Sequence, residues 1–121
     1  MERKSAFAAL LTAVLLAFCL SHSTAQTQSS PRKIDVIVKR FAYEPGEVTV
    51  KKGQPVVIAL KSTDVAHGLR FRELNLDTKI PAGGASELKF TPDKTGDFVG
   101  HCSVFCGPGH GAMTLTIHVV E

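Results

Sequence analysis

The 121-residue sequence contains no tryptophan, only one tyrosine and only three cysteines. Without tryptophan, phenylalanine must supply the large side chains of a core, and we expect this role for Phe41, Phe71, Phe90 and Phe98. No C-x-x-C-H motif occurs, which disfavours a covalently attached c-type haem. The net charge is only +3 and no basic block is interleaved with aromatic residues, so nucleic acid is not an expected partner.

The N-terminal segment has the pattern of a secretory signal peptide. Positive charge at Arg3 and Lys4 precedes an apolar run over residues 6–20, and small residues at 23–25 suit cleavage. We therefore expect residues 1–25 to direct export to the periplasm or the outer face of the cytoplasmic membrane. An uncleaved anchor is the alternative, although the run is short for a membrane span. A lipidated Cys19 ranks third, because Phe18 is too bulky for the residue before such a cysteine.

The remainder of the chain is long enough for one domain. Residues 26–32 are polar and predict a flexible lead-in, and residues 33–121 predict the domain itself. Short runs in which apolar and polar residues alternate are typical of half-buried strands, and no helical period is convincing. We predict an all-β Greek-key sandwich of seven or eight strands, seven of them at 33–39, 47–51, 56–61, 68–73, 87–90, 97–102 and 112–120.

A dense group of metal-ligand side chains precedes the last predicted strand. Cys102, Cys106, His110 and Met113 follow one another at spacings of four, four and three residues. Thiolates, an imidazole and a thioether form a soft donor set, which selects copper over magnesium, calcium or manganese. Glycine and proline at 107–111 prevent a continuous helix, so we expect a loop between two strands. Alternation in the last strand turns Met113 inward, together with Leu115, Ile117 and Val119.

A more distant histidine, His67, is expected to join this group. It lies between Leu60 and Leu69, in a loop expected at the same end of the sandwich as the cysteines. Asp64 either orders that loop as an Asx-type turn or merely solvates it. His101 and His118 are expected to face outward. Phe105, Pro108 and Val65 either form an apolar patch that excludes water and receives a partner, or are ordinary loop packing.

Several chemistries compete for these residues. A Cys102–Cys106 disulfide would leave His110 and Met113 unexplained. Zinc bound by both cysteines, His110 and His67 would leave Met113 without a role. A mononuclear blue copper site could use Cys106, His110, His67 and an axial Met113. The mononuclear site is the most serious alternative, but the second thiol, at Cys102, favours a binuclear centre.

The pattern Cys102-x3-Cys106-x3-His110-x2-Met113, preceded by His67, resembles the binuclear copper A (CuA) domain of cytochrome c oxidase subunit II and nitrous oxide reductase. This resemblance covers about residues 33–120 and implies a cupredoxin fold. It implies that Cys102 and Cys106 bridge two copper ions. His67 and Met113 would complete one ion, and His110 with the backbone carbonyl of Val104 the other. The oxidases usually carry glutamate where this chain has Val104, and a tryptophan for electron uptake that this chain lacks.

The resemblance implies an exported one-electron carrier or the copper module of a respiratory oxidase or reductase. Its partner would be a redox protein such as a cytochrome c or a terminal oxidase. No acid–base pair or nucleophile set is visible, so we do not predict catalysis by this chain alone. Alternatives are a mononuclear type 1 cupredoxin, a protein that delivers or buffers copper, and a metal-free disulfide-bonded interaction domain.

Overall fold

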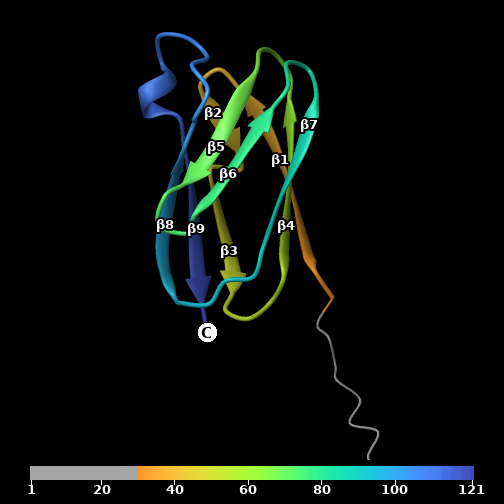
Figure 1. Cartoon of the computed structure of the whole chain (residues 1–121), viewed down its shortest axis with the longest axis vertical. Helices are drawn as coiled ribbons and strands as arrows, with labels where there is room; N and C mark the ends of the chain where they lie inside the picture. Colours follow the sequence, from red (N-terminus) through yellow and green to blue (C-terminus); the bar gives the residue numbers. More distant parts are fainter. Residues whose placement is uncertain (1–29) are drawn as a thin grey trace, which may run out of the picture.

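The structure, a computed structural model, describes residues 30–121. The predicted signal peptide and residues 26–29 of the predicted lead-in lie outside this range. The described part forms strands in two sheets, with one short 3-10 turn, η1 (His110–Ala112) (Figure 1). The predicted all-β sandwich is confirmed. No helix within the described range is long and apolar enough to cross a membrane.

The two sheets contain four and five strands. The first has the order β2-β1-β4-β7, and the second β3-β9-β8-β5-β6. Their bounds are β1 (Arg32–Lys39), β2 (Ala42–Glu44), β3 (Glu47–Lys51), β4 (Val56–Ser62), β5 (His67–Phe71), β6 (Leu76–Ile80), β7 (Ala85–Phe90), β8 (Gly96–His101) and β9 (Thr114–Val120). Strands β1 and β4 pair in parallel, as do β3 and β9, and the other pairs are antiparallel.

Residues 30–121 form nine strands rather than the seven or eight that we predicted, because the alternation of apolar and polar residues did not indicate two short strands. Strand β2 has only three residues, too few to show alternation. Strand β6 contains Asp77, Thr78 and Lys79 and lies at a sheet edge, where polar side chains are tolerated. Its Thr78 hydroxyl is 2.7 Å from that of Ser86 on β7, the edge strand of the other sheet.

The core lies between the sheets, and β9 contributes one complete face to it. Met113, Leu115, Ile117 and Val119 are all buried, whereas the residues between them are not, so the predicted register is confirmed. Phe71 and Phe98 are buried as expected, and Phe90 is partly buried and packs against the core. The prediction for Phe41 is wrong. It is 38% exposed, because it lies in the turn after β1 and packs beside Gly107 and Gly109 rather than in the core.

Gly100 on β8 offers a test of how tightly this core is packed. A Cβ added there would lie 2.6 Å from the Phe71 ring and 2.8 Å from Leu69, both fully buried. Gly100→Ala is therefore expected to lower the free energy of unfolding by about 1–3 kcal/mol, measured by urea denaturation. Gly46→Ala is the control, because its nearest contact would be an ordinary 3.5 Å. Equal stability of the two variants would contradict this packing.

Candidate metal centre

All predicted ligands except His67 lie on the segment that connects β8 to β9. These strands pair up to His101 and Thr114, and one more hydrogen bond, from the Cys102 amide to the Met113 carbonyl, spans 3.2 Å. Both ends of the segment are thereby held side by side. Within it, Gly107 has φ +136°, a conformation that other residues rarely adopt, and η1 carries His110 back toward β9. We call residues 102–113 the ligand loop.

The sulfur atoms of this loop converge on one buried point. The Sγ atoms of Cys102 and Cys106 are 3.8 Å apart, and both cysteines are free. Cys106 Sγ is 3.7 Å from Nδ1 of His110 and 3.9 Å from Sδ of Met113. The Val104 carbonyl oxygen lies 3.1 Å from Cys102 Sγ. The loop therefore gathers its four predicted side chains and the carbonyl oxygen into one cluster.

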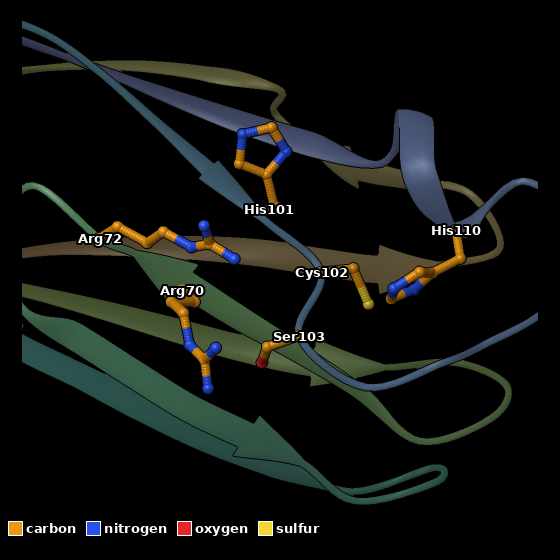
Figure 2. A pocket seen from close by; sticks show the side chains of 6 residues that line it. All are labelled: Arg70, Arg72, His101, Cys102, Ser103 and His110. Atoms are coloured by element: carbon orange, nitrogen blue, oxygen red, sulfur yellow. The ribbon is translucent and has the colours of Figure 1, made fainter.

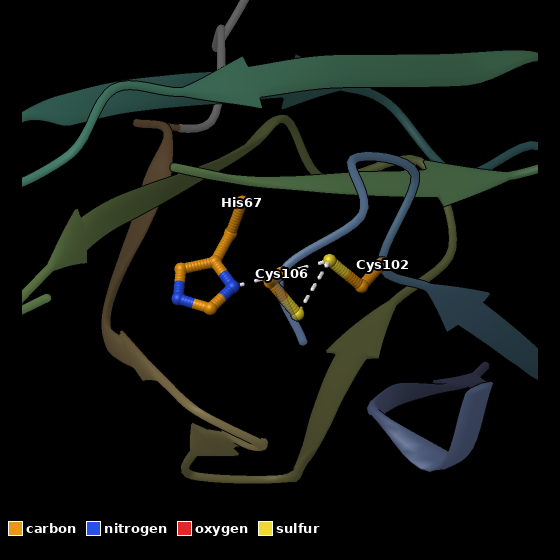
Figure 3. A group of neighbouring side chains, drawn as sticks. All are labelled: His67, Cys102 and Cys106. Carbon is orange, nitrogen blue, oxygen red and sulfur yellow. Dashed lines mark hydrogen bonds between the residues drawn. The ribbon is translucent and has the colours of Figure 1, made fainter. Parts of the chain in front are cut away.

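His67 completes the cluster from a separate part of the chain. It begins β5, is 0% exposed, and places Nδ1 4.0 Å from Cys102 Sγ (Figure 3). The next residue is Gly68, where a Cβ would lie 2.1 Å from the Ser103 hydroxyl, so glycine lets the ligand loop approach β5 closely. On the other side, the Tyr43 hydroxyl donates to the Gly68 carbonyl. The distant histidine and the cysteines thus share one pole of the sandwich.

Asp64 fixes the orientation of the His67 ring. Its Oδ1 lies 2.7 Å from Nε2 of His67 and accepts from the adjacent Val65 amide at 2.7 Å. Asp64 therefore orders this loop, but not as an Asx-type turn, in which the side chain accepts from the amide two residues on. When Nε2 carries the proton, the lone pair of Nδ1 faces the sulfur atoms, as a metal ligand requires. Partial burial acts to raise the pKa of Asp64, but hydrogen bonds from the amides of Arg40 and Val65 and from His67 lower it to about 2.

Arg40 joins the two ligand-bearing segments, a role that the sequence did not indicate. Its backbone amide donates to Asp64 Oδ2 at 2.8 Å, and its guanidinium Nε donates to the Cys106 carbonyl at 2.9 Å. One residue therefore ties the loop that holds His67 to the loop that holds Cys106. No spacing or motif connects position 40 with position 106, so only the folded chain reveals this contact.

The buried Cys106 thiol favours its protonated form in the protein alone. Burial and the neighbouring Cys102 thiol raise the pKa of Cys106, and burial also raises the pKa of Tyr43. Thiolates at this position therefore need a positive charge beside them. A metal cation supplies such a charge, and its binding releases the thiol protons.

The donor atoms fit a metal ion in both distance and chemistry. A metal–thiolate bond is about 2.3 Å and a metal–imidazole bond about 2.0–2.1 Å, so two ligands of one ion are at most about 4.6 Å apart. The 3.8 Å between the Cys102 and Cys106 sulfur atoms and the 4.0 Å between Cys102 Sγ and His67 Nδ1 are both below this limit. Met113 is fully buried with its sulfur beside Cys106, which adds a thioether that zinc does not use. The set fits copper.

The remaining candidate residues lie outside the cluster. His101 is exposed, as predicted, and His118 lies on the outer face of β9, where it hydrogen-bonds Asp97 at 2.6 Å. That hydrogen bond raises the pKa of His118. Phe105 is 78% exposed and its ring centroid lies 5.6 Å from that of His110, whereas Val65 packs partly buried against the core. Phe105 and Pro108 are thus surface residues beside the cluster.

A family model described as "Cupredoxin-like domain" matches residues 9–115. The chain belongs to the cupredoxin-like domain family. Cytochrome c oxidase subunit 2 of Thermus thermophilus is 32% identical to it over 99 residues, which cover 80% of this chain and 73% of that protein. This cupredoxin-like chain spans only 59% of the length of another cytochrome c oxidase subunit 2 from T. thermophilus, to which it is also 32% identical. The predicted relationship to subunit II is confirmed.

Solved structures agree on the cupredoxin fold. The periplasmic domain of cytochrome oxidase subunit II from Bradyrhizobium japonicum superimposes with a TM-score of 0.67 at 22% identity, covering 74% of this chain and 84% of that one. Auracyanin A, a "blue" copper protein of Chloroflexus aurantiacus, gives a TM-score of 0.63 at 17% identity, with coverage of 75% and 100%. At these identities the likeness establishes the fold alone.

We expect Asp64→Asn to weaken copper binding by at least about tenfold, because the neutral amide holds the His67 ring less firmly and turns an N–H toward the Arg40 amide. Competition with a copper chelator measures the affinity. Asp93→Asn removes the same charge from an exposed loop position and is the control. Unchanged affinity in Asp64→Asn would show that this carboxylate does not position His67.

Gly109→Ala tests the packing beneath the ligand loop. The new Cβ would lie 2.5 Å from Cγ of the Phe41 ring, near the base of that side chain, so either the ring or the loop must move. We expect the free energy of unfolding to fall by about 1–3 kcal/mol, measured by thermal unfolding, and copper binding to weaken, measured by chelator competition.

Gly111→Ala is the matched control for Gly109→Ala, since nothing lies within 4 Å of its added Cβ. The double change Phe41→Ala with Gly109→Ala is expected to recover copper binding. If copper binding stays weak in the double variant, contact with the Phe41 ring is not what confines the loop.

Proposed function

We propose that this chain is an exported electron-transfer protein that holds two copper ions in a CuA-type centre. The observation that carries the proposal is the pair of buried, free thiols 3.8 Å apart, each with its own imidazole neighbour. A single-copper site needs only one thiolate, so the second is best explained by bridging. Homology to cytochrome c oxidase subunit 2 supports the same conclusion.

Each residue of the cluster has a distinct task in this proposal. Cys102 and Cys106 would hold both ions, His67 and Met113 would complete the ligands of one, and His110 and the Val104 carbonyl would complete those of the other. Bound copper supplies a one-electron couple. The chain keeps the donors in place: Asp64 orients His67, Arg40 holds the Cys106 carbonyl, and β8 and β9 fix both ends of the ligand loop. Donors held in this way rearrange little when an electron arrives or leaves.

Export and partners form part of the same proposal. Residues 1–25 act as the signal peptide, and the similarity to a periplasmic domain of subunit II agrees with a location outside the cytoplasm. The partner is a redox protein, such as a cytochrome c or a terminal oxidase or reductase. Val104 replaces the usual glutamate and no tryptophan is present, so contacts with such a partner differ from those of the usual oxidase subunit.

A mononuclear blue copper site is the second candidate, favoured by the similarity to auracyanin A. Cys106 has both His110 and Met113 beside its sulfur, which are three of the four ligands that such a site requires. His67 Nδ1, however, lies 4.0 Å from the sulfur atom of Cys102, the thiol that a mononuclear site would leave unused. The binuclear proposal uses all of these contacts, and therefore we prefer it.

Copper reconstitution of the purified chain distinguishes the two candidates. We expect a purple protein with two coppers per chain and a seven-line electron paramagnetic resonance pattern, because the unpaired electron is shared by both ions. Cys102→Ser is expected to abolish this pattern, and Ser103→Ala is the neighbouring control. A blue protein with one copper and a four-line pattern would refute the binuclear proposal.

A further inference from the structure

An open groove lies on the outer face of the five-stranded sheet, beside the metal centre. It has a volume of about 480 Å³ and is lined by Arg70, Arg72, His101, Cys102, Ser103 and His110 (Figure 2). None of these residues is a carboxylate, and two are permanently charged guanidinium groups. The groove therefore offers positive charge and hydrogen-bond donors to whatever occupies it, which is the chemistry that recognises carboxylates.

The two arginines of the groove differ in how far their charge is already neutralised. Arg70 forms a forked pair with Asp77, with Nε at 3.0 Å and Nη2 at 2.7 Å from the same carboxylate oxygen. The Ser103 hydroxyl donates to the other oxygen at 3.2 Å. Arg72 has no ion pair or side-chain hydrogen bond within residues 30–121, and its guanidinium extends over the groove. The positive charge of Arg72 is therefore free to pair with an anion, whereas that of Arg70 is already paired with Asp77.

The groove also reaches the candidate ligands themselves. Cys102 and His110 line it, so a molecule bound beside Arg72 lies against two residues of the metal cluster. Phe105, 78% exposed, stands next to His110 and adds an apolar contact at this end. An open groove with exposed arginines and a protruding aromatic ring suits the surface of a protein better than a small enclosed ligand.

We propose that this groove receives an acidic patch on the redox partner of the chain. Carboxylates of the partner pair with Arg72 and the histidine N–H groups, and this contact brings the partner's redox group to the pole that carries Cys102 and His110. One electron then passes between the two proteins, so that one is oxidised as the other is reduced. This inference rests on the proposed electron-transfer function and specifies its partner by charge. The contact weakens with salt, because exposed charges are screened beyond about 8 Å at physiological ionic strength.

The first experiment needs no metal and therefore tests the groove independently of the proposed function. The full chain, without copper, is titrated with a hexaglutamate peptide and followed by nuclear magnetic resonance. We expect shifts concentrated at Arg70, Arg72, His101 and Ser103 that fade as salt is added, and at least threefold weaker binding in Arg72→Glu. Shifts spread over the whole surface, or equal binding by the variant, would overturn the proposal.

The second experiment measures electron transfer by the copper-loaded chain. Ferricyanide accepts one electron as an anion, and tris(phenanthroline)cobalt(III) accepts one as a cation. Arg72→Glu is expected to slow the reaction with ferricyanide at least about threefold at low salt and to speed the reaction with the cobalt complex. Lys51→Glu makes the same change of charge on the far end of β3 and is expected to alter neither rate. Equal effects of both variants would show that only net charge matters, and would overturn the groove assignment.

Two further measurements separate the possible outcomes. Inorganic phosphate that saturates the groove while hexaglutamate does not bind would identify a site for small free anions, and would overturn the docking proposal. Copper stoichiometry and the paramagnetic resonance pattern of Arg72→Glu are expected to match those of the unmodified chain. If the peptide binds as expected but the chain holds no redox-active copper, the proposed function fails while the anionic recognition stands.

Discussion

The pairing of β8 with β9 is the constraint on which the metal centre depends. The ladder runs to His101 and Thr114, and the bond from the Cys102 amide to the Met113 carbonyl closes the loop directly above it. A ligand loop whose ends could separate would not keep Cys106 Sγ within 4 Å of both Cys102 Sγ and Met113 Sδ. Packing of Leu115, Ile117 and Val119 fixes the register of β9 and therefore the inward direction of Met113.

Two carboxylates, those of Asp64 and Asp77, help to connect this loop to the rest of the fold. Asp64 binds the His67 ring and the Arg40 amide, and Arg40 in turn holds the Cys106 carbonyl. Asp77 binds the Ser103 hydroxyl and Arg70. The hydrogen bonds from Arg70 and Ser103 lower the pKa of Asp77. The hydrogen bonds to Asp64 likewise lower its pKa, although its partial burial acts to raise it. The positions of His67 and the cysteines are therefore set by polar contacts as well as by the apolar core.

The sequence predicts what depends on periodicity and on local spacing. Alternation located seven of the nine strands and the buried face of β9, and ligand spacing grouped Cys102, Cys106, His110 and Met113. The sequence could not predict contacts between segments that lie far apart in the chain and meet only in the fold. The side chain of Arg40 contacts Cys106, which is 66 positions further along the chain. Phe41 lies outside the core because the turn after β1 places it beside Gly107 and Gly109. Strands as short or polar as β2 and β6 carry too little pattern to be recognised.

The direction of β1 decides how the domain faces its surroundings. Its last residues lie near Asp64 and the metal pole, whereas Arg32, at its start, pairs with Val56 at the other end of the sandwich (Figure 1). Eight residues of strand separate these ends by about 23 Å. Any tether joined before Arg32 would thus be attached at the base of the domain. The pole that carries the candidate metal ligands would then point away from that attachment and remain accessible.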